Sequence, residues 1–118
     1  MNLRTLQRYC SSLPGAAECL LPDPYNILVY GLAERDFAYF KTSEPERWRF
    51  SVKVSPERFL ELTAQPGVKP ARYRARQHWV TIVEVSKFPA EYLRELVRGS
   101  HEFARMKLPR ARRPGAAG

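Results

Sequence analysis

The chain has 118 residues, of which 44% are hydrophobic and 27% are charged, and its formal net charge is +8. This size supports one domain with a single modest core, and the composition excludes disorder over most of the length. The apolar runs are too short to cross a bilayer and the N-terminus lacks a signal-peptide core, so we expect a cytoplasmic protein without a membrane partner.

The positive charge is concentrated in the second part of the chain. Residues 1–68 contain 8 Lys+Arg against 8 Asp+Glu, and residues 69–118 contain 12 against 4, so the whole excess follows residue 68. Such asymmetry is typical of a protein with a polyanionic partner, and it also occurs in small basic proteins that bind none. Charge alone therefore leaves both interpretations open.

The first half of the chain predicts one helix and three strands. Asn2 is suited to cap a helix that turns Leu6 and Cys10 inward and ends before Pro14. Residues 13–25 contain three prolines and a glycine, which indicates a structured loop. β-Branched and aromatic residues then predict three strands, the last two joined in a hairpin, over residues 25–32, 36–42 and 48–54.

The second half predicts two helices and two extended segments. Ser55 followed by Pro56 is typical of a helix start, and this helix is expected to run to about residue 64 with Phe59, Leu60 and Thr63 facing the core. Residues 72–76 are expected to be extended, and after a turn residues 78–85 are expected to form a strand. A final helix from Pro89 has an apolar face made of Leu93, Leu96, Val97, Ser100, Ala104 and Leu108.

These elements predict a single α+β domain over residues 1–108. Its antiparallel sheet is expected to have about five strands, with three flanking helices. Residues 109–118 are basic and then rich in small residues, Pro and Gly, so we expect them to form a disordered tail.

Residues suited to catalysis or metal binding are not grouped in this sequence. His78 and His101 are far apart, and Cys10 and Cys19 form no CxxC motif and are expected to stay reduced. There is no glycine-rich phosphate loop and no carboxylate pair at a recognisable spacing. We therefore expect no enzyme activity, no catalytic residue, no metal ion and no cofactor.

The stretch KPARYRARQHWVTI, residues 69–82, is the strongest candidate binding surface. In an extended backbone, Arg72, Arg74 and Arg76 lie on one face and Tyr73 on the other. Tyr73 either stacks on exposed bases or packs at the core or rim of the sheet. The predicted nucleic-acid-binding residues come from this stretch, from the strand at 48–54 and its approach, and from the tail: Lys69, Arg72, Arg74, Arg76, His78, Arg47, Arg49, Lys53, Arg110, Arg112 and Arg113.

The final helix carries a second basic stripe, made of Arg94, Arg98, His101 and Arg105. A glutamate stands three residues before each of these arginines, so each arginine is expected to be partly neutralised by a solvated ion pair. For this stripe we favour that interpretation over a binding surface.

Four stretches resemble the MmcQ/YjbR family of small bacterial proteins: LPGA, SVKV with the Pro-Glu helix start after it, QHWVTI, and ELVRGSHEFARMKLP. The resemblance runs from about residue 13 to residue 109 and implies an α+β fold described as a double wing, for which DNA binding has been proposed. It points to residues 69–78 and Trp79, and to no catalytic residue. Frataxin-like iron binders share this fold group, but the first helix offers Arg4 and Arg8 and no carboxylate, so we set iron binding aside.

Two hypotheses for the function follow. In the first, the chain binds duplex DNA through phosphates on a basic surface, with little sequence preference because no base-reading group of residues is identifiable. In the alternative, it is a non-enzymatic protein-interaction module that uses the sheet face or a sheet edge. The sequence indicates neither an oligomeric state nor a small-molecule ligand.

Overall fold

The structure is a computed structural model that describes residues 1–117, and in that range it contains a six-stranded antiparallel sheet and three α-helices. The order of strands across the sheet is β1-β2-β3-β4-β6-β5. This confirms the predicted α+β class, with one strand more than expected. In chain order the strands are β1 (Ala17–Leu21), β2 (Ile27–Leu32), β3 (Arg35–Lys41), β4 (Phe50–Lys53), β5 (Val68–Pro70) and β6 (Trp79–Ile82).

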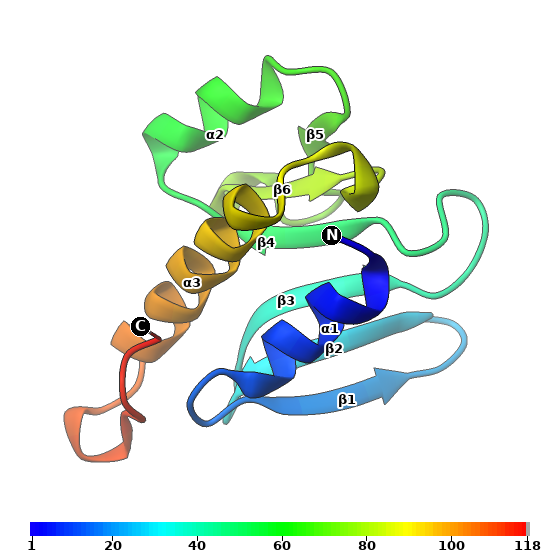
Figure 1. The fold of residues 1–118 in the computed structure, drawn as a ribbon. Helices are drawn as coiled ribbons and strands as arrows, with labels where there is room; N and C mark the ends of the chain where they lie inside the picture. Colours follow the sequence, from blue (N-terminus) through cyan, green and yellow to red (C-terminus); the bar gives the residue numbers. More distant parts are fainter. Residues whose placement is uncertain (118) are drawn as a thin grey trace.

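The helices lie on one side of the sheet, as Figure 1 shows. α3 packs against β3 and β4 and also contacts α1, while α2 packs beside β5 and β6. The α-helices are α1 (Leu3–Ser12), α2 (Pro56–Thr63) and α3 (Ala90–Met106), and the 3-10 helices are η1 (Ala75–Gln77), η2 (Val85–Lys87) and η3 (Arg110–Arg112).

The two predicted helix caps are present. The Asn2 side chain accepts a hydrogen bond from the Thr5 N–H at 2.8 Å, and the Ser55 side chain accepts one from the Arg58 N–H at 3.2 Å. In α2, however, Leu62 is the buried residue and Leu60 is 73% exposed, so the expectation that Leu60 faces the core is wrong.

Strand β1 was expected to be part of a loop. Its residues are almost all exposed, and it is an edge strand that pairs only with β2. A strand without a buried side has no alternation of apolar and polar residues to reveal it. The prolines that suggested a loop, Pro14 and Pro22, flank β1 without interrupting its hydrogen bonds.

The core lies between the sheet and the helices, and Phe40, Phe50 and Val80 are fully buried in it. The apolar face predicted for α3 is confirmed, because each of its six residues is buried. His101 is fully buried as well, against Phe37, and its Nε2 lies 2.9 Å from the Pro14 carbonyl oxygen. The assignment of His101 to an exposed basic stripe is therefore wrong.

Residues 109–117, expected to be a disordered tail, make defined contacts in the structure. η3 follows Pro109, the Arg105 Nε donates to the Pro114 carbonyl at 2.8 Å, and Ala117 packs against the core. Gly15, with φ +73°, lies directly beneath Pro114, where a Cβ would sit only 3.0 Å from the proline ring. The chain thus returns along α3 toward the loop between α1 and β1 (Figure 1).

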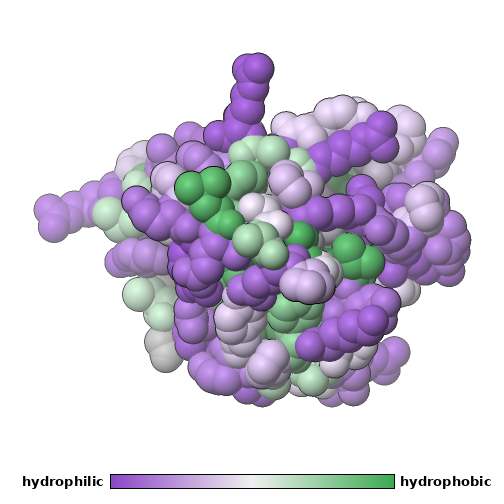
Figure 2. Space-filling model, turned by 90° about the horizontal axis from the view of Figure 1, so that it is seen from above, coloured by the Kyte–Doolittle hydropathy of each residue, from purple (hydrophilic) through white to green (hydrophobic). Residues whose placement is uncertain are grey.

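The outer surface is mixed in character. Seen from above, apolar side chains form small groups separated by hydrophilic ones (Figure 2). Among residues 1–117, none of the helices is both long and apolar enough to span a membrane.

Candidate nucleic-acid interface

The loop between β5 and β6 does not have the extended backbone expected for residues 72–76. β5 and β6 form an antiparallel pair, and the chain between them turns through η1. Tyr73 and His78 have positive φ angles of 69° and 64°, and the Trp79 N–H donates to the Arg74 carbonyl at 3.2 Å. An alternating row of side chains needs an extended strand, so the predicted face of three arginines is wrong.

Arg74 packs on two aromatic rings of the sheet. Its guanidinium lies 4.8 Å from the Trp79 ring centre and 5.3 Å from that of Tyr39, and it forms an ion pair with Asp36 at 3.0 Å. Trp79 and Tyr39 themselves pack together at 5.5 Å. Arg72 instead lies exposed over Tyr73, at 5.1 Å from its ring, and Arg76 is exposed.

Several predicted binding residues are neutralised by carboxylates from the first part of the chain. Glu46 accepts from the Lys69 ammonium at 2.7 Å and pairs with the Arg49 guanidinium at 3.0 Å. These hydrogen bonds, led by that from Lys69, lower the pKa of the Glu46 carboxyl. Arg47 lies 3.6 Å from Glu44. The end of the sheet near the β3–β4 turn is therefore less basic than its sequence indicates.

The arginines of the tail differ from one another. Arg112 pairs with Glu34 at 3.1 Å, and Arg113 donates to the backbone carbonyls of Leu108 and Met106 at 3.1 and 3.4 Å. Arg110 is exposed. Arg113 therefore satisfies carbonyls at the C-terminal end of α3.

One group of cations gathers in a hollow of about 420 Å³ between the C-terminal end of α3 and the start of β3. We call it the basic hollow; the charged side chains that line it are Glu34, Arg35, Asp36, Lys53, Arg74 and Lys107. Glu34 is paired with Arg112 and Asp36 with Arg74. Within residues 1–117, Arg35, Lys53 and Lys107 form no ion pair.

Lys53 occupies an electrostatically unfavourable position in the basic hollow. Its ammonium donates to the Gln77 carbonyl and lies 5.5 Å from the centre of the Phe103 ring. Burial lowers the pKa of Lys53, and the nearby charge of Lys107 lowers it further. A bound anion would supply a counter-charge to Lys53 and so reduce its repulsion by Lys107.

A second hollow, of about 280 Å³, lies on the other side of Arg74. We call it the tyrosine hollow, because its lining includes Tyr25, Tyr39 and Tyr73, together with Arg49 and Arg72. Tyr73 is 88% exposed and Tyr25 is 69% exposed. Of the two roles considered for Tyr73, packing in the core is therefore excluded.

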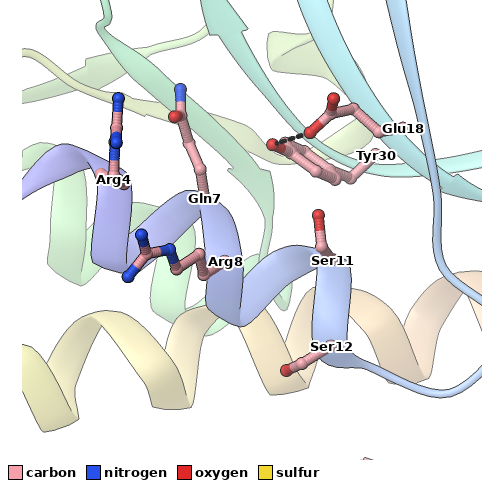
Figure 3. Close-up of a pocket in the computed structure, with 7 residues that line it drawn as sticks. All are labelled: Arg4, Gln7, Arg8, Ser11, Ser12, Glu18 and Tyr30. Atoms are coloured by element: carbon pink, nitrogen blue, oxygen red, sulfur yellow. Dashed lines mark hydrogen bonds between the residues drawn. The ribbon is translucent and has the colours of Figure 1, made fainter.

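A third hollow, of about 420 Å³, lies beside α1 (Figure 3). Arg4, Arg8 and Ser11 line it from the helix, and the Tyr30 hydroxyl donates to the Glu18 carboxylate at 2.6 Å on the sheet side. Burial and this carboxylate raise the pKa of Tyr30. Because Glu18 offsets one of the two arginines, this hollow is less basic than the basic hollow.

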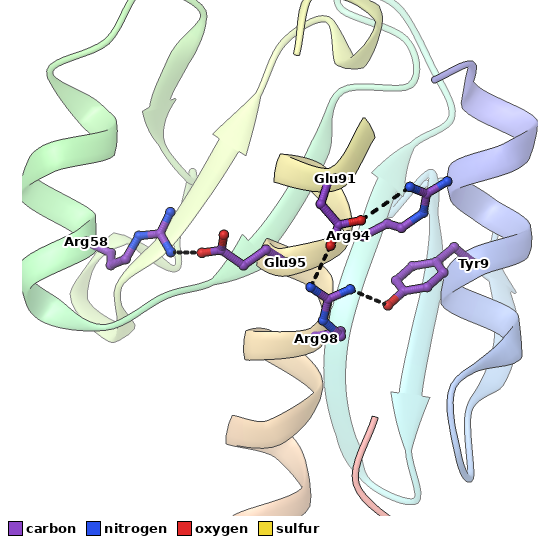
Figure 4. A network of polar contacts seen from close by, with 6 residues as sticks. All are labelled: Tyr9, Arg58, Glu91, Arg94, Glu95 and Arg98. Carbon is purple, nitrogen blue, oxygen red and sulfur yellow. Dashed lines mark hydrogen bonds and ion pairs between the residues drawn. The ribbon is translucent and has the colours of Figure 1, made fainter. Parts of the chain in front are cut away.

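The arginines on α3 are mostly engaged in ion pairs (Figure 4). Glu91 accepts from Arg98 at 2.9 Å and from Arg94 at 3.4 Å, and the hydrogen bond from Arg98 lowers the pKa of Glu91. Arg98 also donates to the Tyr9 hydroxyl of α1 at 3.2 Å. The predicted neutralisation of the stripe is confirmed for Arg94 and Arg105, each paired with the glutamate three residues before it.

Glu95 departs from that pattern, because it pairs with Arg58 of α2 and not with Arg98 (Figure 4). The network therefore joins α1 and α2 to α3. We assign it a structural role.

Sequence reasoning missed Arg35, Lys107 and Tyr25 as candidate site residues. Arg35 stands between two acidic residues and so looks neutral in the sequence, although both of them pair with other arginines. Of these three residues, Lys107 was the one that the sequence could have indicated, because it lies two residues before the basic tail. His78, which was predicted, is half-buried and packs edge-on against Phe59 at 5.6 Å. Within residues 1–117, no group of His, Cys, Asp or Glu side chains is placed to hold a metal ion.

Comparison with known proteins identifies the family. The YjbR family model matches residues 11–103. The chain belongs to the YjbR family. The uncharacterized protein YjbR of Escherichia coli strain K12 is 30% identical to it over 115 residues, which cover 96% of this chain and 95% of that protein.

Solved structures agree with this assignment to the YjbR family. A crystal structure of a Deinococcus radiodurans protein with the DUF419 domain superposes with a TM-score of 0.77 at 32% identity, covering 94% of this chain and 84% of that one. A Pseudomonas syringae protein has a TM-score of 0.71 at 18% identity, over 89% of this chain and 100% of that one, and shows likeness of fold. The resemblance drawn from the sequence is confirmed.

Proposed function

We propose that this YjbR-family chain binds DNA through its phosphates, with little sequence preference, by the basic hollow and the loop at residues 71–78. The observation that supports this most strongly is the gathering of Arg35, Lys53 and Lys107 in one hollow. These residues come from three distant parts of the chain, and among residues 1–117 none of the three has a carboxylate partner. Arg35 and Lys107 are exposed and Lys53 is partly buried. Unpaired cations gathered in a concave site favour an anionic ligand.

The proposed interface is smaller than the one expected from the sequence. Arg47, Arg49 and Lys69 contribute less to it because Glu44 and Glu46 neutralise them. The contact region runs from the basic hollow past Arg74 to Arg72 and Arg76. The family resemblance implies a double-wing fold for which DNA binding has been proposed, and this placement of the cations is consistent with it. A cytoplasmic location, expected from the sequence, is consistent with a DNA ligand.

A salt series on the wild-type chain is the direct test of phosphate binding. If six cations each contact a phosphate, the affinity for a labelled duplex should fall with a log–log slope of about −5, because each contact releases about 0.9 counterion. Fluorescence anisotropy between about 50 and 200 mM salt measures this slope. A flat profile, or no binding at the lowest salt, would remove the proposal.

Charge removal in the basic hollow tests the location. The double variant Lys53→Gln/Lys107→Gln should bind the duplex about tenfold more weakly and have a slope smaller by about 2. Lys87→Gln is the matched control, because Lys87 is exposed in η2, before the opposite end of α3. The 17 residues of α3 place Lys107 about 25 Å from the end of the helix that Lys87 precedes. Equal losses in the double variant and in the control would place the contact elsewhere.

The alternative, a protein-interaction module, is supported by strand β1. This edge strand pairs only with β2, and Leu20 on it is 61% exposed. A partner strand could add to such an edge. Recovery of one stoichiometric protein partner that survives nuclease treatment, and that Leu20→Lys abolishes, would favour this function over DNA binding.

A further inference from the structure

The tyrosine hollow brings exposed aromatic rings and cationic side chains together. Tyr25 comes from the loop between β1 and β2 and Tyr73 from the loop between β5 and β6, and both rings line the same hollow while remaining mostly exposed. Its charged lining consists of Lys41, Arg49, Arg72 and Arg74. Arg49 is paired with Glu46 and Arg74 with Asp36, so within residues 1–117 Lys41 and Arg72 are the two lining cations without an ion pair. Flat rings with cations beside them suit a ligand that is planar, aromatic and anionic.

The backbone at Tyr73 is strained. Its φ of +69° puts a bulky side chain in the left-handed region that glycine prefers, and the exposed ring recovers no burial energy in return. Strain of this kind concentrates at sites that bind ligands. The conformation directs the ring outward beside Arg72, whose guanidinium lies 5.1 Å from the ring centre.

The two hollows share one lining residue. Arg74 lines both of them, and its guanidinium is held in place by Asp36 and by the rings of Trp79 and Tyr39. A strand whose phosphates lie in the basic hollow therefore reaches the tyrosine hollow directly past Arg74. The bases of a duplex are stacked on each other and have no free face for a tyrosine ring. An unpaired base has a free face and can stack on one.

We propose that the tyrosine hollow stacks an unpaired base of a single-stranded nucleic acid, on Tyr73 and Tyr25, while Arg72 and Arg74 contact the flanking phosphates. This inference rests on the proposed phosphate binding and adds a preference for single strands. The volume of about 280 Å³ has room for one base or two. Stacking on a tyrosine is tolerant of base identity, so sequence preference stays weak.

The test compares two oligomers of equal length and charge, a labelled oligothymidylate and its abasic analogue, against the wild-type chain at about 50 mM salt. We expect the oligothymidylate to bind about tenfold more tightly, and Tyr73→Ala to remove most of this difference, so that its affinity for the oligothymidylate falls by more than its affinity for the abasic analogue. Tyr73→Phe should keep the difference because it keeps the ring. The control is Leu60→Ala, which truncates an exposed apolar side chain on α2, away from both hollows; it should change neither affinity.

The outcomes separate this inference from the proposed function. Equal affinity of the wild-type chain for the two oligomers, or an unchanged difference in Tyr73→Ala, would overturn base stacking and leave phosphate binding in place. If the wild-type chain binds the labelled duplex and neither oligomer, base stacking is overturned alone; if it binds none of the three, both proposals are overturned. Tyr73→Gly guards against misfolding as an explanation: it relieves the positive φ, so it should be more stable than Tyr73→Ala and bind equally weakly.

Discussion

Replacing Arg74 by alanine is expected to lower the affinity for DNA by about tenfold to a hundredfold at low salt. The substitution removes a cation that lines both hollows, and it leaves the Asp36 carboxylate unpaired beside the remaining cations. The loss should therefore exceed that of an ordinary phosphate contact. Fluorescence anisotropy with a labelled strand, in single-stranded and duplex form, measures it.

The Asp36→Asn variant is expected to change the affinity for DNA in the direction opposite to Arg74→Ala. Removing the carboxylate frees the Arg74 guanidinium and makes the basic hollow more positive, so Asp36→Asn should bind DNA more tightly than the wild-type chain. The double variant Arg74→Ala/Asp36→Asn should fall between the two single variants. If both single variants weaken binding to the same extent, the ion pair acts through folding and Arg74 is not a phosphate ligand.

The fold was largely predictable because half-buried strands and helices have apolar residues at regular spacings in the sequence. Strand β4 alternates apolar residues with Ser51 and Lys53, and α3 repeats apolar residues at helical spacing, so both elements were located, although β4 is shorter than the predicted 48–54. β1 was missed because an exposed edge strand has no such spacing. The misassignment of Leu60 has a similar origin, because in a helix as short as α2 a neighbouring position satisfies the spacing nearly as well.

The candidate site was predictable in composition and not in arrangement. The basic stretch at residues 69–82 does contain Arg72 and Arg74, but the chain leaves the extended conformation at Tyr73, where φ is +69°, and the two arginines contact different rings. A turn was expected only after residue 76, whereas the chain already turns at Tyr73 and continues through η1. Ion pairs such as Arg74–Asp36 join residues 38 positions apart, so the sequence cannot show which cations stay free. The same long-range folding brings Arg35 beside Lys107.

The largest loss of stability is expected for Ser100→Ala, at about 2–4 kcal/mol. Ser100 lies in α3 at 1% exposure; its hydroxyl donates to the Phe37 carbonyl at 2.6 Å and accepts from the Lys53 N–H at 3.0 Å. The ladder between β3 and β4 extends only from Phe40 and Phe50 to Ala38 and Val52, so the next pair of backbone groups depends on this hydroxyl. Alanine leaves a donor and an acceptor buried without partners, and each costs about 1–3 kcal/mol.

Ser12→Ala is the matched control for this substitution. Ser12 also lies in an α-helix, so alanine brings the same gain in helix propensity, but its hydroxyl bonds the Tyr9 carbonyl at an exposed position. Urea unfolding should show a lower midpoint for Ser100→Ala at an unchanged slope and almost no change for Ser12→Ala. Similar midpoints in the two variants would mean that water or a backbone shift satisfies Phe37 and Lys53.

Ser100 also connects stability to the proposed function, because it lines the basic hollow and fixes the backbone of Lys53. Once this anchor is lost, the Lys53 ammonium is no longer held beside Lys107, and the folded fraction of Ser100→Ala should bind DNA more weakly than its stability alone explains. Measuring affinity in the absence of urea, with the active fraction determined by titration, separates the two effects. An affinity per folded molecule equal to that of the wild-type chain would show that the position of Lys53 does not matter for binding.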